Sequence, residues 1–155
     1  MANTKKIEEM LMTAIFEVFE KMYYLFVEPL RVGDGTYQMT SAISFKGPSV
    51  GMMYLSLSRG IVEEMVKNML NLEKEEITEQ VMADCVKESI NMICGNFVRK
   101  LDPEKVFHLS IPTFGVFRPE PQEGEDGGND IRLTFTAEGG YIEIAVKSED
   151  LRQQA

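Results

Sequence analysis

The sequence predicts an α/β protein of the α+β type, in which two long helices pack side by side on one face of an antiparallel sheet. Apolar residues recur at helical spacing in two long segments, and strand-forming runs occur in pairs separated by turn residues. The composition, 44% hydrophobic and 26% charged, is that of a globular protein, and 155 residues suit one hydrophobic core. We therefore expect a single domain over residues 1–155.

The first third of the chain predicts a helix followed by a hairpin. Apolar residues at helical spacing, with Asn3 or Thr4 as a cap, predict a helix that ends at about Leu25. Residues 37–45 and 50–58 are strand-like, and the Lys-Gly-Pro-Ser segment between them is typical of a turn. These two strands therefore form a hairpin.

Two further helices are predicted in the middle of the chain. Ser58 can cap a short helix over residues 59–71, whose apolar residues form one stripe. Thr78 then opens the longest helix, over residues 79–101. This helix stops before Pro103, because proline disfavours a helical conformation in the residue ahead of it.

The last third of the chain predicts three strands, at residues 107–117, 131–137 and 141–146. A Glu-Gly-Gly segment between the last two indicates a tight hairpin. Residues 119–130 are acidic and glycine-rich, but they lack the regular ligand spacing of a calcium loop. A solvated loop is therefore favoured there over a cation-binding loop.

The two halves of the chain show a weak internal repeat. In each half a long helix precedes a strand and a hairpin, and residues 51–57 resemble residues 140–146. The long helices carry polar residues at the same relative spacing, namely Thr13, Glu17 and Glu20 in the first and Asp84, Glu88 and Asn91 in the second. A duplicated helix-plus-antiparallel-sheet unit would place both helices on one face of the sheet.

The charge balance narrows the class of partner. With 25 acidic and 16 basic residues the chain has a net charge of -9. Binding to nucleic acid or to anionic lipid requires clustered Lys and Arg, so we predict neither nucleic acid nor membrane as a partner.

The apolar run near the N-terminus is too short for a membrane span and does not fit a secretory signal, so we expect a cytoplasmic protein.

Cysteine and histidine give little support for a metal or nucleophile site. His108 is the only histidine and has no Cys or Asp neighbour at metal-ligand spacing. Cys85 and Cys94 lie on about opposite faces of one predicted helix, so they do not form a disulfide, and neither has the features of a catalytic cysteine. We predict that this chain binds no metal.

The longest predicted helix displays a line of polar residues. Its apolar side, which we expect to face the core, consists of Met82, Val86, Ile90, Ile93 and Phe97. On the opposite side Asp84, Glu88, Asn91 and Gly95 follow at spacings of four, three and four. They therefore form one outward line, on which a carboxylate and a carboxamide can contact the same small target.

Gly95 needs an explanation, because glycine in a helix interior costs about 1 kcal/mol relative to alanine. One explanation is that a partner's backbone approaches the helix at this point. The alternative is an ordinary solvated helix face. In that case Asp84 and Lys87 interact locally, and Gly95 permits close packing within the molecule.

One segment of the longest predicted helix reads Asp84-Cys-Val-Lys-Glu88-Ser-Ile-Asn91-Met-Ile-Cys-Gly95-Asn96, and Ile-Pro112 lies downstream of it. This pattern resembles the signature of the CheX, CheC and FliY chemotaxis phosphatases. Their pattern is an Asp or Ser, three residues, Glu, two residues, Asn and a later proline. The similarity covers nearly the whole chain and looks closest to CheX, because no Asn follows Glu17 at the corresponding spacing in the first half.

This resemblance implies a phosphatase that acts on the aspartyl phosphate of a CheY-like response regulator. Asn91 would orient the attacking water, and Glu88 would contact the regulator's active-site lysine, so these are the implied catalytic residues. The implied partner contacts are Asp84, Gly95, Asn96 and Pro112.

The resemblance also implies no cofactor on this chain, because the Mg²⁺ ion and the phosphoryl group would belong to the phosphorylated receiver domain. It implies a homodimer that continues through the sheet edges. An alternative function is a binding module that holds a response regulator or flagellar switch component without hydrolysis. A structural oligomer subunit that associates through the polar line of the helix is a third possibility.

Overall fold

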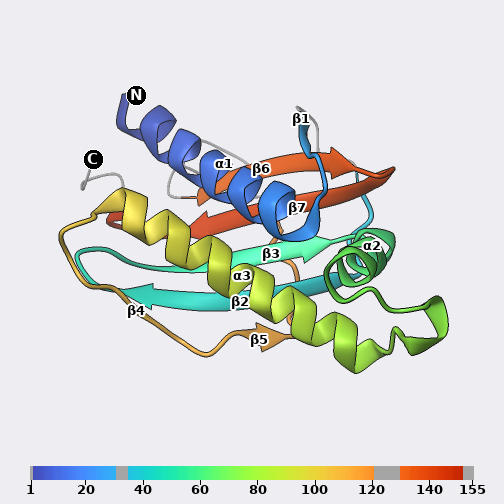
Figure 1. The fold of residues 1–155 in the computed structure, drawn as a ribbon. Helices are drawn as coiled ribbons and strands as arrows, with labels where there is room; N and C mark the ends of the chain where they lie inside the picture. The colour runs from blue at the N-terminus through green and yellow to red at the C-terminus, as the bar shows by residue number, and fades with distance from the viewer. Residues whose placement is uncertain (1, 31–34, 121–129, 152–155) are drawn as a thin grey trace.

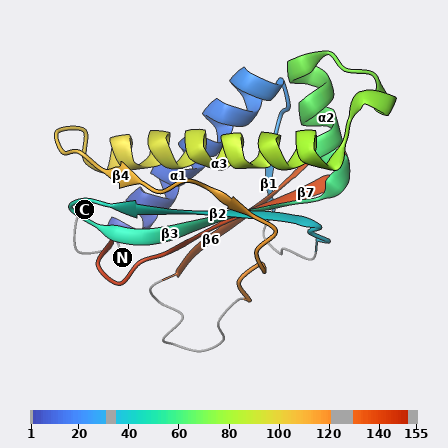
Figure 2. The same ribbon diagram turned by 90° about the horizontal axis from the view of Figure 1, so that it is seen from below.

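In the computed structural model of the chain, three helices cover one face of a seven-stranded antiparallel sheet (Figure 1). The structure describes residues 2–30, 35–120 and 130–151, and these counts refer to them. The helices are α1 (Ala2–Tyr23), α2 (Arg59–Leu70) and α3 (Glu79–Leu101), and a short 3₁₀ turn, η1 (Lys74–Glu76), precedes α3. Figure 2 shows all three helices on the same side of the sheet, which confirms the predicted α+β fold.

The sheet is built around two hairpins. Its strands are β1 (Glu28–Leu30), β2 (Met39–Lys46), β3 (Val50–Leu57), β4 (His108–Leu109), β5 (Thr113–Phe114), β6 (Asp130–Ala137) and β7 (Gly140–Lys147). Their order is β1-β6-β7-β3-β2-β4, and β5 also pairs with β2. The hairpins β2–β3 and β6–β7 meet through the central β3–β7 pair.

The short strands exchange partners between the two halves. β1 precedes the first hairpin in sequence but pairs with β6 of the second. β4 and β5 precede the second hairpin but pair with β2 of the first. Each half of the repeat therefore completes the sheet of the other half, and the two halves share one hydrophobic core.

The predicted strand over residues 107–117 is wrong as a single element. Only His108–Leu109 and Thr113–Phe114 pair with β2, and the residues between them are Ser110, Ile111 and Pro112. Proline has no N–H to donate to a ladder, which interrupts the pairing at this point. β1 is too short to have been predicted and carries Pro29 at the sheet edge.

The helix ends follow local backbone chemistry. α1 ends at Tyr23, two residues earlier than predicted, because Tyr24 adopts the left-handed region at φ 56°. Thr78 caps α3 as predicted, accepting a hydrogen bond from the Val81 N–H at 3.2 Å. Ser58 occupies the N-cap of α2 without a side-chain capping bond, and its hydroxyl donates to the Thr36 carbonyl at 2.9 Å instead.

Both hairpins form where the turn residues predict them. Lys46 pairs with Val50 across the first turn, and Ala137 pairs with Gly140 across the second. Glu138 and Gly139 have φ angles of 49° and 76°, the positive values that a two-residue hairpin turn of this kind requires. Most of the acidic glycine-rich loop, residues 121–129, lies outside the described residues.

The predicted apolar face of α3 is buried in the core. The residues of that face, none more than 4% exposed, are Met82, Val86, Ile90, Ile93 and Phe97. Phe97 meets Phe45 of β2 edge to face, with 6.4 Å between the ring centroids. Burial of this face turns the polar line of α3 away from the sheet.

α1 packs beside α3 in the opposite direction, as expected for the two long helices (Figure 1). Near one end of the contact the Tyr23 hydroxyl lies 2.7 Å from the Ser89 hydroxyl. Ser89 also donates its only hydroxyl hydrogen to the Cys85 carbonyl, so Tyr23 is the donor in the Tyr23–Ser89 bond. Farther along, Lys100 bonds Glu17 at 2.9 Å.

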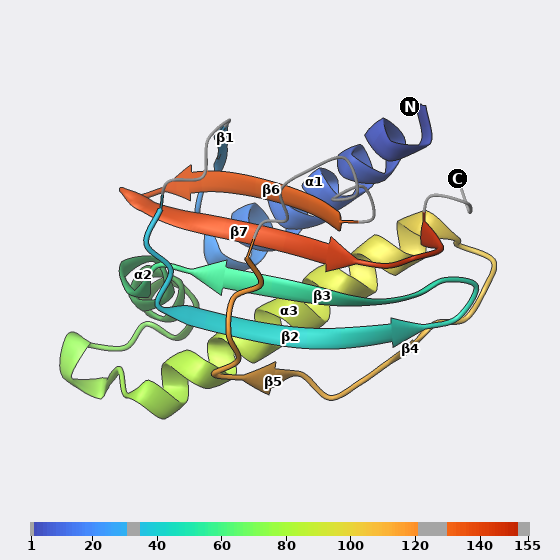
Figure 3. The same cartoon turned by 180° about the vertical axis from the view of Figure 1, so that it is seen from behind.

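The face of the sheet opposite the helices carries a buried ion cluster. The chain after β5 crosses this face, as Figure 3 shows. Arg118 in this segment donates two hydrogen bonds, 2.9 and 2.6 Å long, to the Glu143 carboxylate of β7. Arg132 of β6 also bonds Glu143, whose side chain is only 2% exposed. These pairs compensate the buried charge and fasten the segment to the sheet.

No helix within the described residues has the length and the apolar composition that a membrane crossing requires.

The Tyr23–Ser89 bond yields a stability prediction. Tyr23→Phe removes a buried hydrogen bond without changing the ring, so the free energy of unfolding should fall by about 1 kcal/mol in urea denaturation. Tyr24→Phe is the matched control, because the Tyr24 side chain is 71% exposed and its hydroxyl has no hydrogen bond to a described residue. Equal stability of the two variants would contradict a structural role for the bond.

Candidate functional site

Four of the predicted site residues line one hollow on the outer side of α3. This first hollow, of about 490 Å³, is lined by Asp84, Lys87, Glu88, Asn91, Ser110, Ile111 and Pro112. The helix supplies the polar side, and the irregular segment between β4 and β5 supplies the opposite wall. The proline that interrupts the sheet pairing therefore stands across from the acidic helix face.

Glu88 and Asn91 are exposed and form no hydrogen bond or ion pair with a described residue. Asp84 differs, because its carboxylate accepts a hydrogen bond from the Gln80 amide at 2.9 Å and lies 3.6 Å from the Lys87 amine. The local contact between Asp84 and Lys87 considered from the sequence is thus confirmed. The carboxylate of Glu88 and the amide of Asn91, one helical turn apart, are available to a partner.

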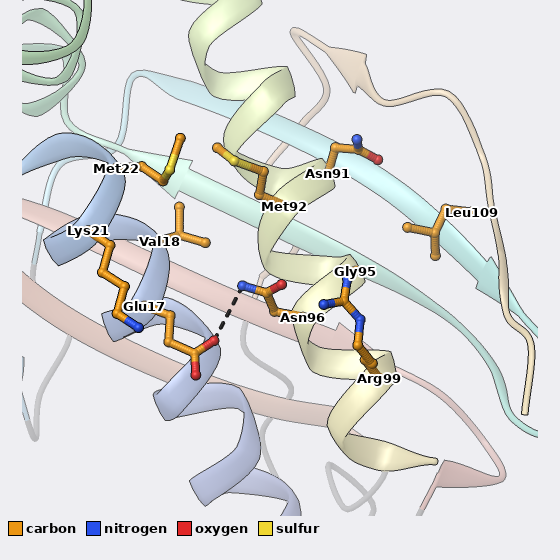
Figure 4. A pocket seen from close by; sticks show the side chains of 10 residues that line it. All are labelled: Glu17, Val18, Lys21, Met22, Asn91, Met92, Gly95, Asn96, Arg99 and Leu109. Atoms are coloured by element: carbon orange, nitrogen blue, oxygen red, sulfur yellow. Dashed lines mark hydrogen bonds between the residues drawn. The ribbon is translucent and has the colours of Figure 1, made fainter. Parts of the chain in front are cut away.

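A second hollow lies between α1 and α3 and shares Asn91 with the first. Its volume is about 550 Å³, and its lining residues, drawn in Figure 4, are Glu17, Val18, Lys21, Met22, Asn91, Met92, Gly95, Asn96, Arg99 and Leu109. Asn91 therefore stands on the ridge between the two hollows. Gly95 and Asn96, both predicted as partner contacts, lie in the second hollow and not in the first.

An ion pair occupies the α1 side of the second hollow. Glu17 accepts hydrogen bonds from the Lys100 amine at 2.9 Å and from the Asn96 amide at 3.4 Å, the latter marked by the dashed line in Figure 4. Asn96 thus turns toward α1, away from the outward line of Asp84, Glu88 and Asn91. Glu17 occupies the position that matches Glu88 in the internal repeat, but its charge is neutralised within the chain.

The packing explanation for Gly95 is wrong. A Cβ atom built on Gly95 would have no heavy atom within 4 Å outside its own stretch of helix. The residue is inside α3 and has an ordinary helical backbone, so neither close packing nor a positive φ angle explains a glycine there. Gly95 instead leaves the floor of the second hollow open between Asn91 and Arg99.

The groups buried next to Glu88 are neutral at neutral pH. Burial raises the pKa of the Cys85 thiol to about 11 and raises the pKa of the Tyr23 hydroxyl above its usual value. Both cysteines are free, and burial likewise raises the pKa of Cys94 to about 12. Neither thiol therefore has the low pKa of a catalytic cysteine.

The described residues contain no group of three or more His, Cys, Asp or Glu side chains able to hold a metal ion. His108 is exposed on β4 and lines neither hollow. Ser110 lines the first hollow, but its hydroxyl accepts a hydrogen bond from the Ser44 N–H at 2.9 Å and has no neighbouring base. Because Asp84 and Lys87 pair with each other, the groups that the first hollow offers to a partner are the Glu88 carboxylate and the Asn91 carboxamide.

Sequence reasoning missed the cationic side chains of the second hollow. Arg99 follows Gly95 at a spacing of four and so extends the polar line of α3, which was a usable signal. Lys21 and Met22 come from α1, and their place in the hollow depends on the register between two helices that are distant in sequence. No local pattern carries that information.

A family model described as chemotaxis phosphatase CheX matches residues 39–135, more than half of the chain. The chain belongs to the CheX family. This membership confirms the resemblance to the CheX, CheC and FliY proteins that the signature on α3 indicates. No curated protein sequence matches the chain.

Solved structures of CheX-type proteins share the fold. CheX from Vibrio vulnificus is 22% identical, with a TM-score of 0.74, and the match covers 91% of this chain and 95% of that one. CheX in the CheX–CheY–BeF₃–Mg²⁺ complex from Borrelia burgdorferi is 17% identical, with a TM-score of 0.68 and coverage of 90% and 96%. FliY from Thermotoga maritima is 15% identical, with a TM-score of 0.58 and coverage of 96% and 89%.

Proposed function

We propose that this CheX-family chain removes the phosphoryl group from the aspartyl phosphate of a CheY-like response regulator. The observation that carries the proposal is the exposure of Glu88 and Asn91, one turn apart, in a hollow that Pro112 closes from the other side. Family membership supports the class of reaction. The Borrelia burgdorferi complex of CheX with CheY supports the choice of partner.

Asn91 orients the attacking water in this proposal. The water oxygen attacks phosphorus, the bond between phosphorus and the aspartate oxygen breaks, and the aspartate leaves as a carboxylate. Because an acyl phosphate is a reactive mixed anhydride, alignment of the water for in-line attack is the main requirement, and no protein nucleophile is needed. The Asn91 amide can accept one hydrogen bond from the water and donate another to a neighbouring group.

Glu88 sets the position of the regulator by pairing with the regulator's active-site lysine. The carboxylate has no ion pair with a described residue, so pairing with an incoming ammonium group breaks no such contact within the chain. The Mg²⁺ ion, when present, is held by the regulator and neutralises charge on the phosphoryl group. A pair that is partly desolvated by the partner is stronger than an exposed one and fixes the docking register.

The remaining predicted contact residues have different roles in this proposal. Asp84, held by Gln80 and Lys87, supports the acidic end of the helix face. Pro112 contacts the regulator from the opposite wall, and Gly95 admits its backbone close to α3. A partner contact of Asn96, the homodimer, the single domain over residues 1–155 and the cytoplasmic location stay predictions.

The binding-module alternative predicts a different experimental result. A non-catalytic module would bind the phosphorylated regulator in a saturable way and release no phosphate. A phosphatase releases phosphate at a rate that depends on the chain's concentration. Phosphate release from a phosphorylated receiver domain in the presence of Mg²⁺ separates the two.

Replacement of Asn91 tests the positioning of water. Asn91→Ala should preserve the fold and receiver binding, because the side chain is exposed, but lower turnover roughly a hundredfold, or about 2.7 kcal/mol. Glu75→Ala removes an exposed polar side chain that lines neither hollow and should leave turnover within about twofold of the parent. Unchanged phosphate release by Asn91→Ala would exclude the proposed role.

Replacement of Glu88 tests the lysine contact. Glu88→Ala should lower receiver affinity about tenfold and turnover with it, and the remaining affinity should depend less on salt because one charge pair is lost. Glu20→Ala is the matched control, since Glu20 is an exposed carboxylate at the corresponding region of α1 and lines neither hollow. A Glu88→Ala variant that binds like the parent at every salt concentration would contradict the contact.

Replacement of Gly95 separates docking from folding. Gly95→Ala should stabilise the protein by about 0.5–1 kcal/mol, because alanine is the better helix former and has free space here. It should nevertheless weaken receiver binding, measured by titration calorimetry. Gly60→Ala in α2 is the control, since a Cβ there also meets nothing within 4 Å and Gly60 lines neither hollow. If Gly95→Ala binds as tightly as Gly60→Ala, no partner approaches the helix at this point.

A further inference from the structure

The exposed line on α3 changes sign along its length. Asp84 and Glu88 are acidic, Asn91 and Gly95 are uncharged, and Arg99 is basic. From Glu88 to Arg99 the line spans eleven residues, or about 16 Å at 1.5 Å per residue. A partner that covers the whole line therefore meets a negative end and a positive end, with Asn91 between them.

The positive end coincides with the second hollow. Arg99 and Lys21 line it from α3 and α1, and neither forms an ion pair with a described residue. Among the described residues the only carboxylate in the lining is Glu17, which is already neutralised by Lys100. Within a chain of net charge -9, this hollow is consequently a local cationic site.

Arg99 is directed along the helix toward Asn91. Figure 4 shows its side chain extending from the lower turn of α3 toward Gly95, whose missing side chain leaves the path open. The direction is the ordinary one for helical side chains, which point toward the helix N-terminus. The guanidinium group of Arg99 therefore lies nearer than the Cα atom of Arg99 to the position proposed for the phosphoryl group, beside Asn91.

We infer that the second hollow is the docking site for an acidic segment of the receiver domain next to its phosphorylated aspartate, with Arg99 and Lys21 as the pairing cations. This inference rests on the proposed function, from which the partner is taken. Mg²⁺ at a phosphorylated aspartate is held by carboxylates, so the receiver carries negative charge around the reacting group. The continuity of the two hollows at Asn91 brings that charge beside the cationic site.

The opposite charges at the two ends of α3 favour one orientation of the docked receiver. The receiver lysine pairs with Glu88 on one side of Asn91, and the acidic segment pairs with Arg99 on the other. A receiver turned by half a rotation would place like charges together at both ends, which is unfavourable. The two ends thus select the orientation in which Asn91 faces the phosphoryl group.

Charge reversal tests the cationic end. Arg99→Glu should weaken affinity for the phosphorylated receiver about three- to tenfold at low salt, and this difference should narrow at high salt as screening increases. Arg99→Lys keeps the charge and should restore most of the affinity. Because either cation also stabilises the last helical turn, urea denaturation of both variants is needed, and the loss of affinity in Arg99→Glu should exceed any loss of folded protein.

Lys6→Glu is the matched control for this test. Lys6 is an exposed cation on α1 without an ion pair to a described residue, it lines neither hollow, and its reversal changes the net charge equally. Equal affinities of Arg99→Glu and Lys6→Glu, or tighter binding by Arg99→Glu, would overturn the inference while leaving the phosphatase proposal intact. Conversely, a parent chain that binds the receiver through Arg99 but releases no phosphate would overturn the phosphatase proposal alone. A parent chain that does not bind the receiver would overturn both.

Discussion

Burial of one face of α3 determines which residues of the helix point outward. Ile90, Ile93 and Phe97 are fully enclosed between the sheet and the other helices. A helix whose buried side is fixed has no rotational freedom left, so its opposite side is fixed as well. Glu88 and Asn91 are exposed because of this packing, and at a separation of one turn both side chains can reach the same group.

The contact between α1 and α3 makes the two halves of the internal repeat differ. Glu17 and Glu88 hold matching positions in the two halves, yet Glu17 pairs with Lys100 while Glu88 has no such partner among the described residues. The same polar position thus stabilises the helix pair in one copy and is available to a ligand in the other. The short strands of each half pair with the hairpin of the other, so both halves belong to one sheet. The two polar positions therefore have different roles within a single sheet.

The sequence was sufficient where the determining interactions are local. The bounds of α3, both hairpins and the buried face of α3 follow from spacing, caps and turn residues, and the structure confirms them. The division of residues 107–117 into two short strands was not predicted from strand propensity, although Pro112, which has no N–H to donate to a ladder, was a local signal against one continuous strand. The position of Pro112 opposite Glu88 and that of Lys21 near Arg99 depend on contacts between segments distant in sequence.

A reaction that relies on aligned water places strict demands on rigidity. In the proposed mechanism, which has no covalent nucleophile, the rate depends on how closely Asn91 holds one geometry, and small displacements are costly. The middle of a 23-residue helix meets this demand better than a loop, because its backbone hydrogen bonds and its buried face restrain every residue. The segment that carries Pro112 is less regular, but β4 and β5 pair with β2 on both sides of it. The rigid helix therefore suits the proposed alignment of water, and the opposite wall suits the proposed recognition of the partner.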